Sequence, residues 1–301
     1  MPVLQQLAEQ FEVVCVCNHT EEKARRFSEL LGGVPYELDY RELLARPEVE
    51  AIGLMLPIHL NYEVAMEAFK AGKHVLMEKP IAANLAEAKE LLDASSKVSS
   101  VSMVAENLRY KPVLRRLKER LKFGIIGRPY FVKWDSLYYM DINNHYAQTE
   151  WRIHHQYPGG FLTDGGVHNI AALRMLFGEI HKGNSMIRQI RPEIGEMDTL
   201  SYQFYTESGP TGVLNLFYSS AGFHENRLQI FGTEGSLLIE KGEVNLKKEG
   251  VHCRQIDQEE SQGYYEEWLD FYQAIRHRKP VDSSLMEGFL DFSGILQAIQ
   301  T

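Results

Sequence analysis

Apolar runs alternate with amphipathic stretches over the first hundred residues, and this alternation limits what the chain can fold into. The runs at residues 11–16, 49–56, 74–77 and 101–105 each have the length of a buried strand. The stretches between them have helical periodicity. Such alternation is typical of parallel strands joined by helical crossovers. We therefore predict an α/β domain with a parallel sheet at the start of the chain.

Helix signals mark the ends of these stretches. Thr20 and Asp39 are suited to cap the helices that follow them, and Gly32 and Gly33 end the first of these helices. For that first helix we predict a buried face made of Ala24, Phe27, Leu30 and Leu31.

The pattern changes after residue 107. Period-two segments without intervening helices occur at residues 130–137, 199–205, 212–218, 227–231 and 236–240. Successive strands of this kind indicate an antiparallel sheet, and helices are predicted at 165–177 and 264–276. The predicted fold class is thus α/β followed by α+β, with one domain at 1–106 and a second, built on a large and mainly antiparallel sheet, at 107–301.

Composition excludes several functional classes. The net charge is −9, which disfavours a nucleic-acid partner, and the basic stretch at 109–122 is interpreted as a solvated helix face. Three cysteines cannot form a disulfide framework, and no apolar run approaches the length of a membrane span. We predict a cytoplasmic protein without a membrane partner.

Five motifs occur in an order that covers nearly the whole chain. The first is Gly-Lys-His-Val-Leu-Met-Glu-Lys-Pro at 72–80. The others are Asn-Leu-Arg-Tyr at 107–110, Trp-Arg at 151–152, Gly-Gly-Phe-Leu-Thr-Asp-Gly-Gly-Val-His at 159–168 and Phe-Gly-Thr-Glu-Gly-Ser at 231–236. This set resembles the Gfo/Idh/MocA family of oxidoreductases. The resemblance implies a Rossmann-like first domain, a second domain for substrate binding and homo-oligomer formation, and hydride transfer between NAD or NADP and a sugar, polyol or related substrate.

The resemblance also assigns catalytic residues, which are Lys79, Asp164 and His168. Oxidation of an alcohol releases a proton, which a histidine can accept, while an ammonium group favours the developing alkoxide. Asp164 and His168 are four residues apart and share one helix face. Spacing alone leaves another interpretation open, in which Asp164 caps the helix and His168 is a hydrogen-bonded core residue.

Further site residues are implied by the same resemblance. Those implied for the cofactor are Asn18, His19, Thr20, Pro57, Glu78, Lys79 and Asn107, and those implied for the substrate are Arg109, Tyr110, Trp151 and Arg152. Aromatic rings beside hydrogen-bonding groups suit a sugar. A metal site is not predicted, because His154 and His155 are adjacent and zinc spacings are absent.

The sequence departs from the family pattern in its first part. Residues 1–31 contain no glycine, and residues 1–10 look like the end of a first helix, so the first strand and its G-x-G-x-x-G phosphate loop are missing. Asn61 stands where the family often has histidine, and the neutral Asn18 gives no preference for NAD over NADP. We therefore expect residues 1–301 to bind the cofactor weakly and to show little activity. This departure also leaves open a non-catalytic sensing or scaffold protein of the same fold.

One expectation concerns assembly. The strands of the predicted antiparallel sheet carry more large apolar side chains than one covering layer of helices should bury. These are Leu214, Phe217, Tyr218 and Leu228. We therefore expect the second face of the antiparallel sheet to be buried against another copy of the chain.

Overall fold

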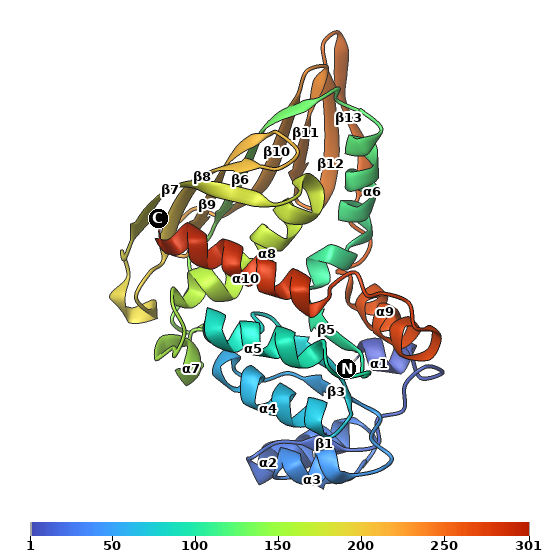
Figure 1. The fold of residues 1–301 in the computed structure, drawn as a ribbon. Coiled ribbons are helices and arrows are strands. Elements are labelled where there is room, and N and C mark those ends of the chain that lie inside the picture. The colour runs from blue at the N-terminus through green and yellow to red at the C-terminus, as the bar shows by residue number, and fades with distance from the viewer. Residues whose placement is uncertain (1, 301) are drawn as a thin grey trace. The chain divides into compact units, whose positions relative to one another are not determined.

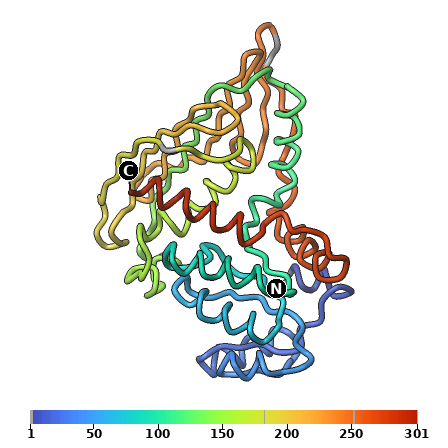
Figure 2. The backbone as a smooth tube through the Cα atoms, viewed as in Figure 1, coloured from blue at the N-terminus to red at the C-terminus, as the bar shows by residue number. Residues whose placement is uncertain are grey.

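The computed structural model describes residues 2–300, without the side chains of Pro2, Lys182, Val251 and His252. These residues form two compact units, whose elements are labelled in Figure 1. The first unit contains residues 2–105 and Tyr264–Phe289, and the second contains Glu106–Gly263 and residues 290–300. The backbone trace in Figure 2 allows the three crossings of the chain between the units to be followed by colour.

The first unit is built on short parallel strands. Its strands are β1 (Val16–Cys17), β2 (Tyr36–Glu37), β3 (Ala51–Leu54), β4 (His74–Glu78) and β5 (Ser102–Ala105). Its helices are α1 (Pro2–Gln6), α2 (Glu21–Leu30), α3 (Tyr40–Ala45), α4 (Ile58–Lys70), α5 (Leu85–Ser95) and α9 (Tyr264–His277), together with the start of α10 (Leu285–Gln300). Strands β3, β4 and β5 form one parallel sheet in that order, and β1 pairs with β2 in a second parallel sheet. The predicted parallel α/β architecture is confirmed.

Two local predictions for the first unit were wrong. Residues 11–16 were expected to form a strand, but only Val16 and Cys17 pair in β1. In α2, Phe27 and Leu30 are 40% and 60% exposed, whereas Ala24 and Ser28 are buried. The sheet that α2 covers has only two residues in each strand. It therefore buries fewer side chains of α2 than the helical periodicity predicts. The predicted cap at Asp39 is present, because its carboxylate accepts a hydrogen bond from the Arg41 backbone N–H at 2.8 Å.

The second unit is built on one eight-stranded sheet. Its strands are β6 (Pro129–Leu137), β7 (Ile180–Arg188), β8 (Thr199–Thr206), β9 (Thr211–Phe217), β10 (Glu225–Gly232), β11 (Gly235–Glu240), β12 (Glu243–Lys248) and β13 (Val251–Gln258). Its helices are the short η1 (Asn107–Tyr110) and η2 (Pro192–Ile194), then α6 (Pro112–Lys122), α7 (Glu150–Ile153) and α8 (Gly160–Phe177), with the remainder of α10. The strand order is β13-β12-β11-β10-β6-β9-β8-β7, and every pair is antiparallel except β6 with β9. The sheet is therefore mainly antiparallel, as predicted.

Helix α8 packs on one face of this sheet. A methyl group at Gly166 would lie 2.7 Å from Leu216 of β9 and 2.8 Å from Ile295 of α10, so glycine allows close packing here. Leu214 is fully buried on the same face of β9. Leu228 of β10 lies on this face as well, because both leucines pair in register with Trp134 of β6, the strand between them.

The argument from Leu214, Tyr218 and Leu228 for a second covering layer was therefore wrong. These side chains are 0%, 5% and 2% exposed within one chain. Phe217 differs from them, because it alternates with Leu216 along β9 and so points to the opposite face.

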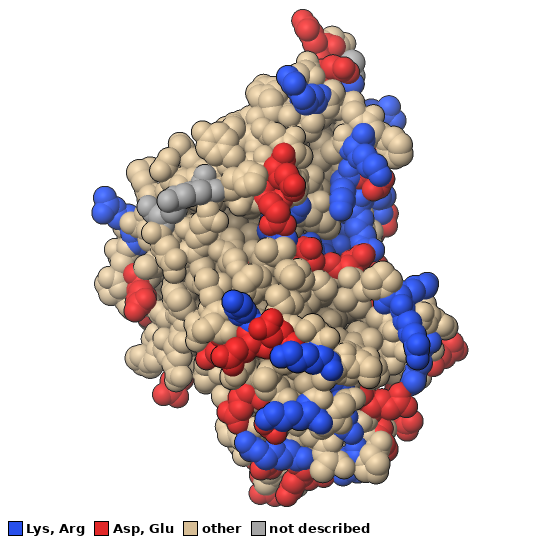
Figure 3. All heavy atoms as spheres, viewed as in Figure 1, with Lys and Arg blue, Asp and Glu red and all other residues tan. Residues whose placement is uncertain are grey.

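The basic stretch at 109–122 is more than a solvated surface. Leu117 of α6 is fully buried, as the periodicity predicts. Arg116 and Arg120, however, reach Asp257 of β13 at 2.7 and 2.6 Å, and the hydrogen bond from Arg116 lowers the pKa of that carboxyl. On the face shown in Figure 3, basic and acidic side chains lie next to each other in the same way.

Candidate active site

Helix α8 carries two of the predicted catalytic side chains. Asp164 and His168 lie one helical turn apart, so they share a face of the helix. The Asp164 side chain is 12% exposed and that of His168 is 30% exposed. The helix begins after Gly159, whose φ of 81° favours glycine, and it therefore starts four residues before Asp164 rather than at it. Asp164 is thus not the helix cap.

Three tyrosines surround Asp164. Burial raises the pKa of the hydroxyls of Tyr138, Tyr157 and Tyr218 above their usual range, and the negative charge of Asp164 adds to each shift. The approach of Tyr218 depends on Gly165, because a methyl group at that position would lie 1.8 Å from the tyrosine oxygen. The three hydroxyls therefore stay protonated near the negative charge of Asp164.

Arg152 of α7 binds Asp164. Its Nε lies 2.8 Å from Oδ2 of the carboxylate, and its guanidinium lies 4.0 Å from the centre of the Trp151 ring. The structure thus brings the predicted catalytic residue Asp164 together with Trp151 and Arg152, which were predicted to bind the substrate. Because the Arg152 guanidinium is held against the Trp151 ring, its hydrogen bond keeps the Asp164 carboxylate in a fixed orientation.

His168 has a partner that the sequence analysis missed. Its Nδ1 lies 2.8 Å from both carboxylate oxygens of Glu106, a residue that is 1% exposed. Glu106 comes directly after β5, and the position following a parallel strand was the one sequence signal that could have marked it. His168 is therefore hydrogen-bonded, as the alternative interpretation required, but its ring is also partly exposed.

Arg109 and Tyr110 are not placed to contact a substrate. Tyr110 is fully buried, and Arg109 is 6% exposed with Nη2 2.6 Å from Asp291. Arg174 of α8 binds the same carboxylate, so Asp291 of α10 joins η1 to α8 within the second unit. The resemblance assigned these two residues to the substrate, whereas the structure buries both and places Arg109 in this charged cluster.

The segment that carries Lys79 is held by Asn61. Lys79 follows β4 in the first unit, and the Asn61 side chain of α4 donates to the carbonyl oxygens of Glu78 and Pro80 at 3.1 and 2.9 Å. Asn61 is fully buried. An amide at this position, in place of the histidine that the family often has, therefore anchors the turn on both sides of Lys79.

The residues implied for the cofactor follow the strands of the first unit, with one exception. Asn18, His19 and Thr20 come after β1, where Asn18 Oδ1 accepts from the Thr20 backbone N–H at 2.9 Å, and Pro57 precedes α4. Doubly wound sheets bind ligands at these carboxyl ends of their strands. Asn107 lies instead in the second unit and donates to the Gln262 carbonyl at 2.8 Å.

The described residues offer partners for the ribose and nicotinamide groups of a dinucleotide, but not for its pyrophosphate. Polar groups follow β1, and Lys79 follows β4, where ribose and nicotinamide groups would need partners. Among residues 2–31, no glycine-rich turn offers backbone N–H groups to a pyrophosphate.

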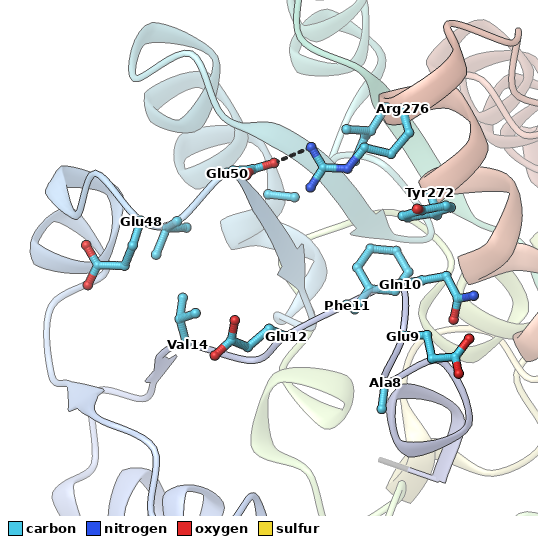
Figure 4. A pocket seen from close by; sticks show the side chains of 13 residues that line it. Ala8, Glu9, Gln10, Phe11, Glu12, Val14, Glu48, Glu50, Tyr272 and Arg276 are labelled. Atoms are coloured by element: carbon cyan, nitrogen blue, oxygen red, sulfur yellow. Dashed lines mark ion pairs between the residues drawn. The ribbon is translucent and has the colours of Figure 1, made fainter.

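A pocket of about 410 Å³ opens in the first unit, between residues 8–14, the start of β3 and α9 (Figure 4). It lies at the amino-terminal end of β3, opposite to the end at which such sheets bind ligands. Its lining includes Glu9, Glu12, Glu48 and Glu50, and its single basic side chain, Arg276, pairs with Glu50 at 2.8 Å. So many carboxylates would repel a phosphate, and the pocket is not a candidate cofactor site.

Within residues 2–300, no three histidine, cysteine or acidic side chains are grouped so that they could hold a metal ion. In the same part of the chain, no helix has both the length and the apolar character needed to cross a membrane.

The fold combines a parallel α/β unit with a unit built on a large mixed sheet, and one helix of the second unit carries a carboxylate and an imidazole on the same face. Comparison with family models identifies the class as oxidoreductases with an NAD-binding domain. Residues 1–106 match the oxidoreductase family with an NAD-binding Rossmann fold, and residues 114–238 match the GFO/IDH/MocA C-terminal domain. The chain belongs to the Gfo/Idh/MocA family of oxidoreductases.

Individual relatives extend this result. An uncharacterized protein of Saccharomyces cerevisiae, YMR315W, is 30% identical over 96% of this chain and 86% of its own length. The crystal structure of an oxidoreductase from Thermotoga maritima is 34% identical, with a TM-score of 0.93 over 100% of this chain and 91% of that one.

A third relative is a levoglucosan dehydrogenase. That of Pseudarthrobacter phenanthrenivorans is 32% identical over 57% of this chain and 43% of the enzyme. A levoglucosan dehydrogenase solved with NADH and levoglucosan shares the fold, with a TM-score of 0.87 and 23% identity over 99% of this chain and 92% of that one.

Proposed function

We propose that this protein transfers a hydride between NAD or NADP and a hydroxyl or carbonyl carbon of a sugar, polyol or related compound. The observation that carries the proposal is the pairing of the buried Glu106 carboxylate with His168, a partly exposed histidine within the segment that matches the family's C-terminal domain. The nicotinamide supplies or accepts the hydride when it is bound. The levoglucosan dehydrogenases, whose substrate is a sugar derivative, support the substrate class.

Each residue has a separate task in this proposal. His168 exchanges the proton of the substrate hydroxyl, and the Lys79 ammonium stabilises negative charge on the substrate oxygen. Asp164, fixed by Arg152, accepts hydrogen bonds from substrate hydroxyls, and the Trp151 ring offers an apolar face to the C–H groups of a sugar.

The test is turnover with a panel of polyols and keto sugars at high concentrations of NADH, NADPH, NAD or NADP. Nicotinamide absorbance reports the hydride transfer, and product analysis identifies the carbon that reacts. Slow turnover of at least one sugar or polyol is expected at these cofactor concentrations, because cofactor binding is expected to be weak. A second candidate, a non-catalytic sensing or scaffold protein, is favoured by the absence of glycine from residues 1–31, and failure of the whole panel would support it.

Cofactor affinity gives a separate prediction. Calorimetric titration of the polypeptide of residues 1–301 with NADH and NADPH is expected to show no saturable heat at micromolar concentrations, because backbone N–H groups for the pyrophosphate are lacking in residues 2–31. The levoglucosan dehydrogenase that was solved with NADH, titrated in parallel, controls for the method. Micromolar binding by residues 1–301 would contradict this prediction.

We further propose that the protein forms a homo-oligomer through the sheet face opposite α8. Met186 of β7 and Tyr205 of β8 are 73% and 60% exposed, and both lie on that face with Phe217. Apolar side chains on an open face favour association with another copy.

This proposal predicts a mass above that of one chain in light scattering at every concentration tested. Met186→Lys is expected to shift the protein toward the monomer, because it places a charge in the proposed interface. Phe123→Lys is the matched control, since Phe123 is 82% exposed and follows α6, outside the sheet. A strictly monomeric wild-type protein would rule out the oligomer.

A further inference from the structure

We infer that Glu106 is a positioning residue that holds His168 in the tautomer with the proton on Nδ1, so that Nε2 exchanges the proton with the substrate. The role in turnover rests on the proposed function, whereas the tautomer does not. The inference concerns two side chains of the second unit that are 62 residues apart in the sequence.

Glu106 is itself fixed. It caps η1, and its Oε1 accepts a hydrogen bond from the Leu108 backbone N–H at 3.1 Å. Its side chain is 2% exposed, whereas that of His168 is 30% exposed. A buried and constrained carboxylate therefore faces the inner side of an imidazole whose ring remains partly accessible.

The chemistry of the two groups determines which nitrogen carries the proton. An ionised carboxylate only accepts hydrogen bonds, so the Nδ1 that lies 2.8 Å from both of its oxygens must donate. In a neutral imidazole the other nitrogen then carries the lone pair. Nε2 has no hydrogen-bond partner among residues 2–300, and it is the nitrogen left to act as the base.

The proton balance of the reaction fits this assignment. In the oxidation of an alcohol, the substrate O–H bond would give its proton to Nε2 as the C=O bond forms, and a bound nicotinamide would take the hydride from the C–H bond. The resulting imidazolium keeps its Nδ1–H directed at Glu106, whose negative charge stabilises it. In the reverse direction Nε2 returns the proton to the oxygen.

Asp164 and His168, which the sequence analysis placed on one helix face, have different partners. In the structure Arg152 binds the Asp164 carboxylate, while Glu106 binds the Nδ1 of His168. Asp164 is thus held by Arg152, and Glu106 orients the base.

The experiment is NMR of the protein labelled with ¹⁵N-histidine, at an alkaline pH where the imidazole is neutral. The expected wild-type result is a protonated Nδ1 and an unprotonated Nε2 for His168, whose signals are identified by their loss in His168→Gln. In Glu106→Gln the amide can either donate or accept, so a mixture of tautomers is expected. Asp198→Asn is the matched control, because Asp198 is a fully buried carboxylate of the same unit that binds backbone N–H groups of residues 190 and 191. It should leave the His168 signals unchanged.

Turnover gives the second measurement. Glu106→Gln is expected to lower kcat about 100-fold with little change in KM, the pattern for a group that acts through the base. A wild-type His168 with its proton on Nε2 would overturn the inference, and so would an unchanged tautomer in Glu106→Gln. If the variant does not fold, the wild-type spectrum alone decides. A correct tautomer in a protein without turnover would refute the proposed function and leave the Glu106–His168 assignment standing.

Discussion

His168→Ala and Lys79→Ala are each expected to lower kcat by roughly 100-fold or more, the usual scale for losing an acid/base group or the stabilisation of a developing oxyanion. The first removes the nitrogen that accepts the substrate proton. The second removes the ammonium that favours the alkoxide. Steady-state kinetics with the substrate identified in the panel would measure both, and substrate affinity should fall much less than kcat.

Two variants make this result specific. His168→Gln keeps a polar side chain that can bond Glu106 but cannot take up the proton, so it should be as slow as His168→Ala. His181→Ala is the control, because His181 is an exposed residue of β7 and should retain wild-type turnover. Near-normal kcat in both the His168 and the Lys79 variant would mean that the site is misplaced.

Asp291→Ala is expected to lower the free energy of unfolding by about 3–5 kcal/mol, because it leaves the buried guanidiniums of Arg109 and Arg174 without their shared carboxylate. The side chains of the two arginines are 7% and 3% exposed and that of Asp291 is 2% exposed, so water cannot replace the lost partner. Equilibrium unfolding in urea, followed by circular dichroism, would measure the change. Burial raises the pKa of Asp291 to about 6 despite the two guanidiniums, and the measurement should be made well above that pH, where the carboxylate is ionised.

The control for Asp291 is a pair at the surface. Glu63 lies 3.1 Å from Arg41, and both side chains are more than half exposed. Glu63→Ala should therefore change the free energy of unfolding by less than about 1 kcal/mol. Equal effects of the two substitutions would show that the buried cluster contributes no more than a surface ion pair.

Local sequence patterns predicted many elements of the fold. The turn at Gly72 followed by an apolar run gave β4, and period-two segments gave β6, β8 and β9, because these signals depend on neighbours within a few residues. The return of Tyr264–Phe289 to the first unit was not predicted, because helix periodicity shows which face is apolar and not which sheet it covers.

The candidate site was predicted in part for the same reason. Asp164 and His168 are neighbours on one helix, so their spacing was informative. Glu106 is 62 residues from His168, and Arg109 is 182 residues from Asp291, so no spacing rule links either pair. The resemblance assigned both Arg109 and Arg152 to the substrate. It could not show that Arg109 forms a buried ion pair with Asp291, whereas Arg152 binds Asp164.

The parallel pairing of β6 with β9 has a consequence for how the site is assembled. Phe131 pairs with Thr211, so 80 residues separate partners in the middle of the sheet, and α7 and α8 lie within that connection. Closing a flexible loop of this length costs about 4 kcal/mol of chain entropy before any contact compensates for it. The helix that carries Asp164 and His168 is thus tethered at both ends by the sheet, and its functional geometry is completed only after a long-range and intrinsically slow step of folding.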